Sequence, residues 1–578
     1  MTVTQRVEAV RPRAVELTKR SIATGIVIGA ALTPCNVYSG LKIGWSFNMS
    51  IAAGLIGAGF WRALAAATPA RPMGLLENNI NQTTASSSAS IISGGLVAPI
   101  PALTLLTGQS LDYGVLAFWV FAVSILGVVV AGSLRHQMVM EEKLPFPAGL
   151  ATAETMTQIH ASGSESSRRL RVLLTGGIVS AAVKLSLEVT GAVTRWAPTA
   201  TLKNLTISLD PSLLMIGFGA IIALRVGVSL LLGCAIAWGV LAPLTLELGW
   251  AQAGPADAVW FEELVTWLLW PGVTLIVVSA LVSFAISLSR LQGGLHLGRM
   301  LQGVLSPRQF LLATAASTAL VVTATFALFG IGLLESVLAV VLSFVLAVVA
   351  ARVTGETGVT PIGALGKITQ LTYGVVTPGD VTSNLMTANV TGGAAGQCAD
   401  LMHDLKTGAV IGATPQSQLW AQVFGVLVGS LVGTLVYLLL IPDPSSMLLT
   451  PEWPAPAVAT WKAVAEVLSK GLSEIPQGAG WAMLVASLIG LAMAIAERNM
   501  PPNMAAYFPS APAIGLAFVI PAWNSLSLFL GAALAALLAR FVPAWARRNT
   551  LALAAGLVAG ERLAGVGLAS YGVGGGRA

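Results

Sequence analysis

The stretch Arg352–Gly408 reads RVTGETGVTPIGALGKITQLTYGVVTPGDVTSNLMTANVTGGAAGQCADLMHDLKTG. It is rich in Gly, Thr and Asn and carries several charges, yet strongly apolar segments lie on both sides of it. We therefore expect the chain to cross this region at membrane depth. Irregular backbone and charged side chains persist at that depth only when they are buried in protein or line a watery cavity. The stretch thus predicts non-helical backbone that forms half of a polar pathway.

The composition of the whole chain agrees with this interpretation. Of 578 residues, 55% are hydrophobic and only 10% are charged, and the mean hydropathy is +0.81. A soluble protein of this size would carry about a quarter charged residues. The chain is therefore predicted to be an all-α, polytopic integral membrane protein. At roughly 20 apolar residues per span, we expect about fourteen to sixteen helical segments, some of which do not cross fully.

The basic residues indicate orientation and do not indicate a nucleic-acid partner. Although the net charge is +6, the basic residues gather between apolar segments, as do Arg547 and Arg548. Five of them precede the first span at Ser21, namely Arg6, Arg11, Arg13, Lys19 and Arg20. Loops rich in Lys and Arg stay on the cytoplasmic side. Residues 1–20 are therefore predicted to be a cytoplasmic tail of a protein of the cytoplasmic (inner) membrane.

No cofactor or metal site is predicted. Cys35, Cys234 and Cys398 are far apart in apolar sequence, and the four His residues show no ligand spacing. Gly366-Lys367 resembles part of a phosphate-binding loop, but Pro361 and Ile368 replace residues which that loop requires. Without a site for ATP, coupling to an ion gradient is the expected source of energy.

The chain repeats itself loosely, which predicts two related halves at residues 21–305 and 306–578. Three short patterns recur in the same order: Gly40–Ile43 and Leu365–Ile368, Asn79–Ile80 and Asn384–Leu385, and Ala148–Glu154 and Ala555–Glu561. Paired, Gly-interrupted segments at corresponding positions of two halves are typical of the binding site of a transporter. The helices there are expected to be interrupted or re-entrant.

Several runs resemble the oligopeptide transporter family. The run TGETGVTP at 354–361, with Lys367 and Gln370 following it, is similar to the signature of that family. Further matches are YSGLKIGWSFNMSI at 38–51, ENNINQTTASSSAS at 77–90, FPAGLATAE at 146–154, DLMHDLKTGAVIGATP at 400–415 and AAGLVAGERLAG at 554–565. The Asn-Pro-Gly and Lys-Ile-Pro-Pro-Arg motifs of the peptide branch are missing. The chain therefore looks closer to the prokaryotic and Yellow Stripe-like members.

The resemblance implies proton-coupled movement of small peptides or metal-chelating amino-acid derivatives across the membrane. An intramembrane enzyme is the first alternative, but no GxSxG, HExxH or paired Asp motif supports it. A channel is the second alternative, and it does not require Gly-interrupted helices in two related halves. The sequence leaves open the substrate, the direction of transport and the oligomeric state.

The candidate substrate-binding residues lie on the two polar, Gly-broken parts of the chain. Lys42 and Lys367 are expected to meet a substrate carboxylate, with snorkelling to the membrane surface as the alternative. Hydroxyls and amides are expected to hydrogen-bond the substrate, with packing between helices as the alternative. This second group comprises Asn79, Asn81, Gln82, Thr83, Gln370, Asn384, Thr387 and Asn389.

The candidate proton-coupling residues are Glu154, Glu356 and Glu561, which lie in apolar or Gly-rich surroundings. Carboxyl groups at membrane depth are typical proton carriers, but each could instead cap a helix or pair with Arg at the surface. A second charged cluster comprises Asp400, His403, Asp404 and Lys406. Its spacing favours one helical face. It predicts either a metal or proton site or, as the favoured alternative, a loop at the cytoplasmic surface.

Overall fold

The computed structural model describes residues 16–44, 48–161, 163–190, 195–289, 303–357, 360, 362–471, 475–501, 504 and 507–575. Within these ranges the regular structure is helical, apart from one antiparallel β-bridge between Trp196 and Leu209. The prediction of an all-α protein is confirmed.

The helices follow one another along the chain, and one π-helical segment extends α5 while another joins α10 to α11. Their bounds are α1 Lys19–Ile43, α2 Ser50–Ala67, α3 Leu75–Ala89, η2 Ser90–Gly94, α4 Pro99–Thr107, α5 Tyr113–Arg135, η3 His136–Glu141, α6 Pro147–Ala161, α7 Gly163–Thr190, α8 Ala200–Asn204, α9 Leu213–Ile221, α10 Leu224–Ile236, η4 Ala237–Leu241, α11 Ala242–Glu247, α12 Phe261–Ser289, α14 Pro307–Phe329, α15 Leu333–Thr357, α16 Ile362–Val376, α17 Val381–Ile411, α18 Pro415–Leu440, α19 Pro444–Met447, α20 Pro456–Lys470, α21 Ala479–Asn499, α23 Ala511–Ala517, α24 Ala522–Phe541 and α25 Pro543–Gly575.

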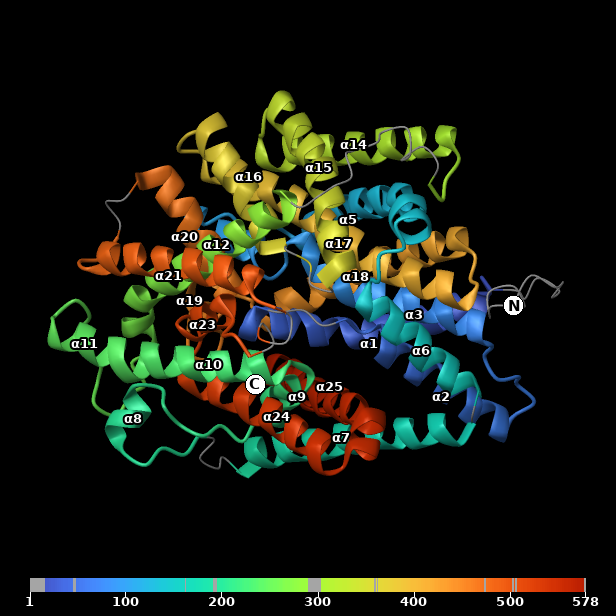
Figure 1. The fold of residues 1–578 in the computed structure, drawn as a ribbon, viewed down its shortest axis with the longest axis horizontal. Coiled ribbons are helices and arrows are strands. Elements are labelled where there is room, and N and C mark those ends of the chain that lie inside the picture. The colour runs from blue at the N-terminus through green and yellow to red at the C-terminus, as the bar shows by residue number, and fades with distance from the viewer. Residues whose placement is uncertain are drawn as a thin grey trace.

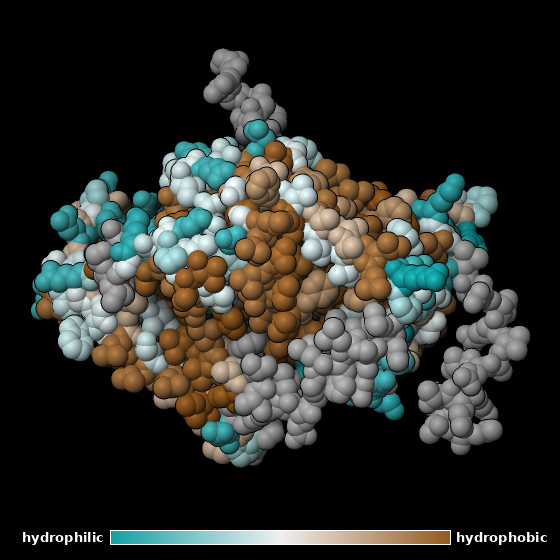
Figure 2. Space-filling view, turned by 90° about the horizontal axis from the view of Figure 1, so that it is seen from above, coloured by the Kyte–Doolittle hydropathy of each residue, from teal (hydrophilic) through white to brown (hydrophobic). Residues whose placement is uncertain are grey.

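Among the described residues, 12 helical segments are long and apolar enough to cross a membrane. The predicted fourteen to sixteen helical segments included some that do not cross fully, and the structure likewise has further helices that are too short or too polar to qualify as spans. Figure 2 shows a broad apolar region across the middle of one face, with hydrophilic residues gathered toward its two ends. Such a band is what a protein presents to lipid. The division into two related halves and the re-entrant segments remain predictions.

The prediction of non-helical backbone within Arg352–Gly408 is wrong for most of the stretch. Helices α15, α16 and α17 account for most of it, and α17 continues without a break from Val381 to Ile411. Likewise α1 passes through Pro34 and Gly40 and ends only at Gly44, whose φ is +72°. A helix satisfies its own backbone hydrogen bonds, so a polar segment buried in protein favours it over irregular backbone.

The apolar side chains form two large cores. The first surrounds α5, α15, α17 and α18, and the second surrounds α10, α12, α23 and α24. Figure 1 places α1, α3, α17 and α18 between α14 to α16 above and α7, α24 and α25 below. Helix α20 contributes Trp461 to the first core and Ala459 and Ala463 to the second. It therefore lies where the two cores meet.

Glycines let the polar helix α3 approach its neighbours closely. A Cβ atom on Gly25 or Gly29 of α1 would lie 2.6 Å or 2.7 Å from side chains of α3. On the other side, a Cβ on Gly425 of α18 would lie 2.3 Å from the carbonyl oxygen of Thr84. Real Cβ atoms do not come this close, so only Gly fits at these positions. Helix α3 is thus held between α1 and α18.

Candidate functional site

Helices α3 and α17 are polar yet buried along almost their whole length. Every residue of α3 from Glu77 to Ala89 is buried, and so is α17 from Ser383 to Ala399. We call their buried Asn, Gln, Ser, Thr, Asp and His side chains the polar layer. Buried polar groups are costly unless they find partners, so a layer of this size requires either mutual hydrogen bonds or a bound species.

The substrate-binding candidates of α3 bond mainly to one another. Asn81 Nδ2 donates to Asn78 Oδ1 at 2.9 Å and to Ala53 O at 3.3 Å. Gln82 Nε2 donates to Thr83 Oγ1 at 3.0 Å and to Asn79 Oδ1 at 3.4 Å. However, Asn79 Nδ2, Asn81 Oδ1 and Gln82 Oε1 have no partner among the described residues. These atoms are the ones available to water or to a ligand.

The substrate-binding candidates on α16 and α17 already have hydrogen-bond partners within the protein. Gln370 Nε2 donates to Asn384 Oδ1 at 3.1 Å, and Asn384 Nδ2 donates to Gln370 O at 2.7 Å, which joins α16 to α17. Asn389 Nδ2 donates to Gly94 O at 3.1 Å, and its amide lies against Gly95, where φ is +111°. Thr387 Oγ1 bonds within its own helix, to Ser383 O. Asn389 therefore packs against the left-handed Gly95 that ends η2, which agrees with the packing alternative.

Lys42 is already paired. Its Nζ donates to Glu452 Oε1 at 2.6 Å, and it lies 5.0 Å and 5.6 Å from the ring centroids of Trp453 and Tyr38. The Lys42 side chain is 8% exposed, whereas that of Glu452 is 62% exposed. Partial desolvation of its carboxyl beside Lys42 raises the pKa of Glu452, but the charge of Lys42 and its hydrogen bond together outweigh this effect, so the pKa lies below its usual value. Lys42 is therefore not a snorkelling residue with a free charge.

Lys367 is buried without such a partner. It is 2% exposed, and its Nζ forms no hydrogen bond among the described residues. The Trp461 ring centroid lies 4.3 Å from Nζ, which is the geometry of a cation–π contact. One turn along α16, Gln370 Oε1 is also buried without a partner. Lys42 contacts Glu452 and Trp453, which come just before α20 in the sequence, and Lys367 faces Trp461 on α20. Both lysines therefore lie beside this part of the chain.

The three predicted proton carriers are not brought together. Glu154 is exposed on α6 and accepts a hydrogen bond from Gln158 Nε2 at 3.0 Å. Glu561 accepts from Ser212 Oγ and from Leu214 N, each at 2.8 Å, at the start of α9. It therefore caps a helix, which was the alternative interpretation. The side chain of Glu356 lies outside the described residues.

The cluster at Asp400–Lys406 is not a surface loop. It lies within α17, where His403 and Asp404 are 5% and 1% exposed. Asp404 Oδ1 accepts a hydrogen bond from Ser50 Oγ at 3.1 Å, and Oδ2 has no partner among the described residues. His403 Nδ1 also lacks a partner, and its ring is edge-on to Phe146. The absence of Pro between Val381 and Ile411 was the sequence signal for one continuous helix.

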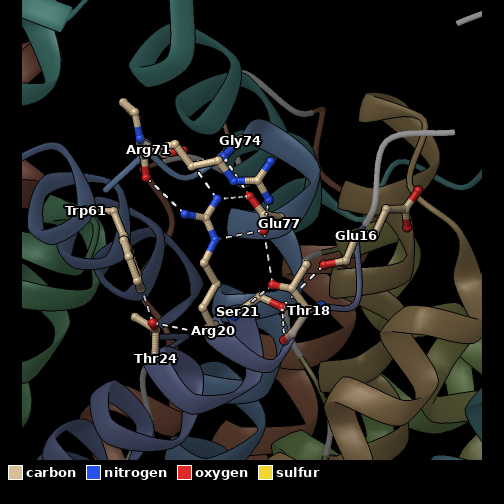
Figure 3. A network of polar contacts seen from close by, with 10 residues as sticks. Glu16, Thr18, Arg20, Ser21, Thr24, Trp61, Arg71, Gly74 and Glu77 are labelled. Atoms are coloured by element: carbon tan, nitrogen blue, oxygen red, sulfur yellow. Dashed lines mark hydrogen bonds and ion pairs between the residues drawn. The ribbon is translucent and has the colours of Figure 1, made fainter. Parts of the chain in front are cut away.

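An ion-pair network holds the first turn of α3 (Figure 3). Arg20 Nε and Thr18 Oγ1 both donate to Glu77 Oε1, at 2.9 Å and 3.0 Å. Arg71 lies 3.4 Å from the same oxygen, and the Arg20 guanidinium lies over the Trp61 ring. The side chain of Glu77 is 7% exposed. This network, which the sequence did not predict, ties the start of α1 to the start of the polar layer.

Among the described residues, no group of three His, Cys, Asp or Glu side chains is placed to hold a metal ion. The cysteines Cys35, Cys234 and Cys398, which all lie among the described residues, are buried and form no disulfide bond. The described residues therefore form a polar layer inside an apolar helical protein. Two lysines lie beside α20, and the Asp404 carboxyl on α17 has one oxygen, Oδ2, without a hydrogen-bond partner among these residues.

Comparison with known proteins agrees with this architecture. The chain matches the family model described as OPT oligopeptide transporter protein over residues 16–302 and 305–570. It is 24% identical over 546 residues to a putative oligopeptide transporter of Saccharomyces cerevisiae, covering 71% of this chain and 75% of the relative. It is 26% identical over 440 residues to a putative oligopeptide transporter of Haemophilus influenzae, covering 66% of each.

A metal-nicotianamine transporter of Arabidopsis thaliana is 25% identical over 268 residues, which is 40% of this chain and 40% of the relative. This match is shorter than the two above, so the predicted closeness to the Yellow Stripe-like branch remains a prediction. At the level of the family, the assignment is clear. The chain belongs to the OPT oligopeptide transporter family, and it is a membrane transporter rather than an enzyme.

Proposed function

We propose that this protein is a secondary active, proton-coupled transporter of oligopeptides or of peptide-like metal chelates in the cytoplasmic membrane. The observation that carries the proposal is the polar layer of α3 and α17 within a protein of 12 candidate spans. Polar side chains at membrane depth mark substrate and ion pathways. The atoms Asn79 Nδ2, Asn81 Oδ1 and Gln82 Oε1, which lack partners among the described residues, supply a donor and two acceptors that suit a peptide backbone.

Lys367 supports a substrate that carries a carboxylate. A buried ammonium without an anionic partner is unfavourable, and a substrate carboxylate would supply that partner. Peptides with a free C-terminus and nicotianamine-type chelators both carry carboxylates, so this feature alone does not separate the two classes. The missing peptide-branch motifs and the metal-nicotianamine transporters among the relatives support the chelate. The two longer matches, both to putative oligopeptide transporters, support the peptide.

A transport assay with a substrate panel tests the proposal. The full chain in proteoliposomes is given labelled trialanine, its C-terminal amide, tetra-alanine and the nickel complex of nicotianamine, with an inward proton gradient. At least one carboxylate-bearing compound is expected to accumulate, and an uncoupler is expected to abolish the accumulation. Uptake that only equilibrates and ignores the uncoupler would contradict proton coupling and would favour a channel.

Orientation is part of the same proposal. The basic residues before Ser21 support a cytoplasmic N-terminus, because Lys and Arg near the first span are retained inside. A single cysteine introduced beside Arg6, in a variant without the native cysteines, should resist a membrane-impermeant thiol reagent in intact cells. Labelling from outside would contradict this orientation.

A further inference from the structure

One buried carboxyl lies where four elements of the polar layer meet. Asp404 is 1% exposed, accepts from Ser50 of α2, and faces Gln82 of α3. Gln418 of α18 donates its Nε2 to Asp404 O at 2.6 Å. At this carboxyl, Asp404 Oδ2 and the facing Gln82 Oε1 lack partners among the described residues. The site therefore has spare hydrogen-bonding capacity, which is typical of a position that exchanges protons or water.

No cation balances a charge on Asp404 in the part of the chain that the structure describes. The titratable residues of α2, α3 and α18 are Arg62, Glu77 and Tyr437. Arg62 donates to Ile159 O, and Glu77 is held by Arg20 and Arg71. On α17 itself, Asp400 lies one turn away and adds negative charge, whereas His403 faces Phe146. Lys406 lies against Gly149 of α6, the helix that also carries the exposed Glu154.

The hydroxyl of Ser50 lies between the Asp404 carboxyl and the Ser86 hydroxyl. Its Oγ donates to Asp404 Oδ1 at 3.1 Å and to Ser86 Oγ at 2.9 Å, but a serine hydroxyl carries a single hydrogen. When the Asp404 carboxyl is ionised, Ser50 donates to it. When the carboxyl is protonated, Asp404 itself can donate to Ser50 Oγ, and Ser50 is free to donate to Ser86. In the ionised state the Ser86 hydroxyl can in turn donate to Ser50, so the two states of Asp404 favour opposite directions of the hydrogen bonds that join α17, α2 and α3.

We propose that Asp404 is the residue that binds and releases the coupling proton, and that Ser50 couples its protonation state to α3 because the direction of the Asp404–Ser50–Ser86 hydrogen bonds reverses. This inference rests on the proposed function and deepens it, since it names the coupling group. One proton binds to one carboxylate oxygen from the side of high proton concentration and leaves on the other side. Asp404 replaces the sequence candidates Glu154, which is exposed, and Glu561, which caps α9.

The first experiment needs no substrate. The full chain in liposomes is titrated while infrared difference spectra record the C=O stretch of protonated carboxyl groups. Asp404→Asn should lose one band, whereas Asp400→Asn and the exposed control Glu262→Gln should keep it. Ser50→Ala should keep the band but shift it, because a hydrogen bond to the carboxyl is gone. If Asp404→Asn keeps every band, or if Asp400→Asn removes the band instead, the proposal is wrong.

The second experiment separates this proposal from the proposed function. Using whichever panel compound the wild-type protein accumulates, Asp404→Asn should lose gradient-driven accumulation and retain exchange of labelled for unlabelled compound, because Asn mimics the protonated carboxyl. Accumulation that persists in Asp404→Asn overturns the role of Asp404 and leaves the transporter intact. If the wild-type protein accumulates no compound, the proposed function fails, and the infrared titration still decides about Asp404. Should Asp404→Asn not fold, Asp404→Glu, which keeps the carboxyl, is expected to shift the same band, and an unchanged spectrum contradicts the proposal.

Discussion

Replacing Lys367 with Met tests whether this lysine binds the substrate or only stabilises the folded protein. Met keeps most of the length of the side chain and removes the charge. In the unliganded protein the ammonium is buried without a hydrogen-bond partner among the described residues. Burying an ion costs several kcal/mol even after relaxation. Its contact with the Trp461 ring returns about 2 kcal/mol, which offsets only part of this cost. The substitution should therefore leave the thermal midpoint unchanged or raise it.

Binding should respond in the opposite direction. A hydrogen bond between a charged donor and a substrate carboxylate contributes about 1.5–3 kcal/mol. At 1.4 kcal/mol per tenfold, its loss weakens the apparent affinity by about 10- to 150-fold. Lys42 should behave differently, because Glu452 already satisfies it and a substrate would have to displace that carboxylate. The two lysines are thus unequal in this conformation, although they occupy echoing positions in the sequence.

The assay combines a thermal unfolding scan in detergent with competition uptake in proteoliposomes. Trialanine and its C-terminal amide serve as competitors if the transported compound is a peptide. Amidation should weaken competition in the wild-type protein and have little further effect in Lys367→Met, because both changes remove the same contact. The exposed Lys203→Met is the matched control. An unchanged affinity in a folded Lys367→Met protein, or a clear fall in its thermal midpoint, would refute the assignment.

Three further outcomes are expected. Gly425→Ala should destabilise the protein by about 1–3 kcal/mol, because the new Cβ meets Thr84 O at 2.3 Å, whereas Gly114→Ala, with open space around it, should be neutral or stabilising in the same thermal scan. Glu77→Gln should lower stability by about 3 kcal/mol, because it leaves the Arg20 guanidinium with an uncharged partner; an equal midpoint for variant and wild type would contradict a stabilising role for this network. Since the pKa of Glu452 is lowered in the folded protein, its stabilising pairing with Lys42 is complete above the unfolded-state pKa and is lost as pH falls through the folded value. The difference in midpoint between wild type and Glu452→Gln should therefore be constant from about pH 8 to 5 and shrink below about pH 4, and a difference that grows on acidification would oppose this assignment.

The sequence by itself determined the class of the protein and its family. A chain with 10% charged residues cannot cover a soluble surface, so its apolar segments must face lipid or one another. The motif runs then identified the family without any structure. The polar run at Glu77–Ser90 and the part of the second run from Ser383 to Ala399 were also correctly recognised as buried, because side chains of that kind cannot face lipid.

Only the tertiary structure decided which of those polar groups find partners. Lys42 and Glu452 are 410 positions apart and meet because α1 packs beside the start of α20. Periodicity could not show that Glu154 points outward, or that Glu561 meets the start of α9. Nor could it show that Asp404, assigned from sequence to a surface loop, lies among α2, α3 and α18. Local composition decides whether a helix is buried, but the contacts of each of its faces depend on helices that are distant in the chain. Those contacts decide whether a charged side chain is paired, is exposed to solvent or keeps an unpaired atom that can bind a ligand.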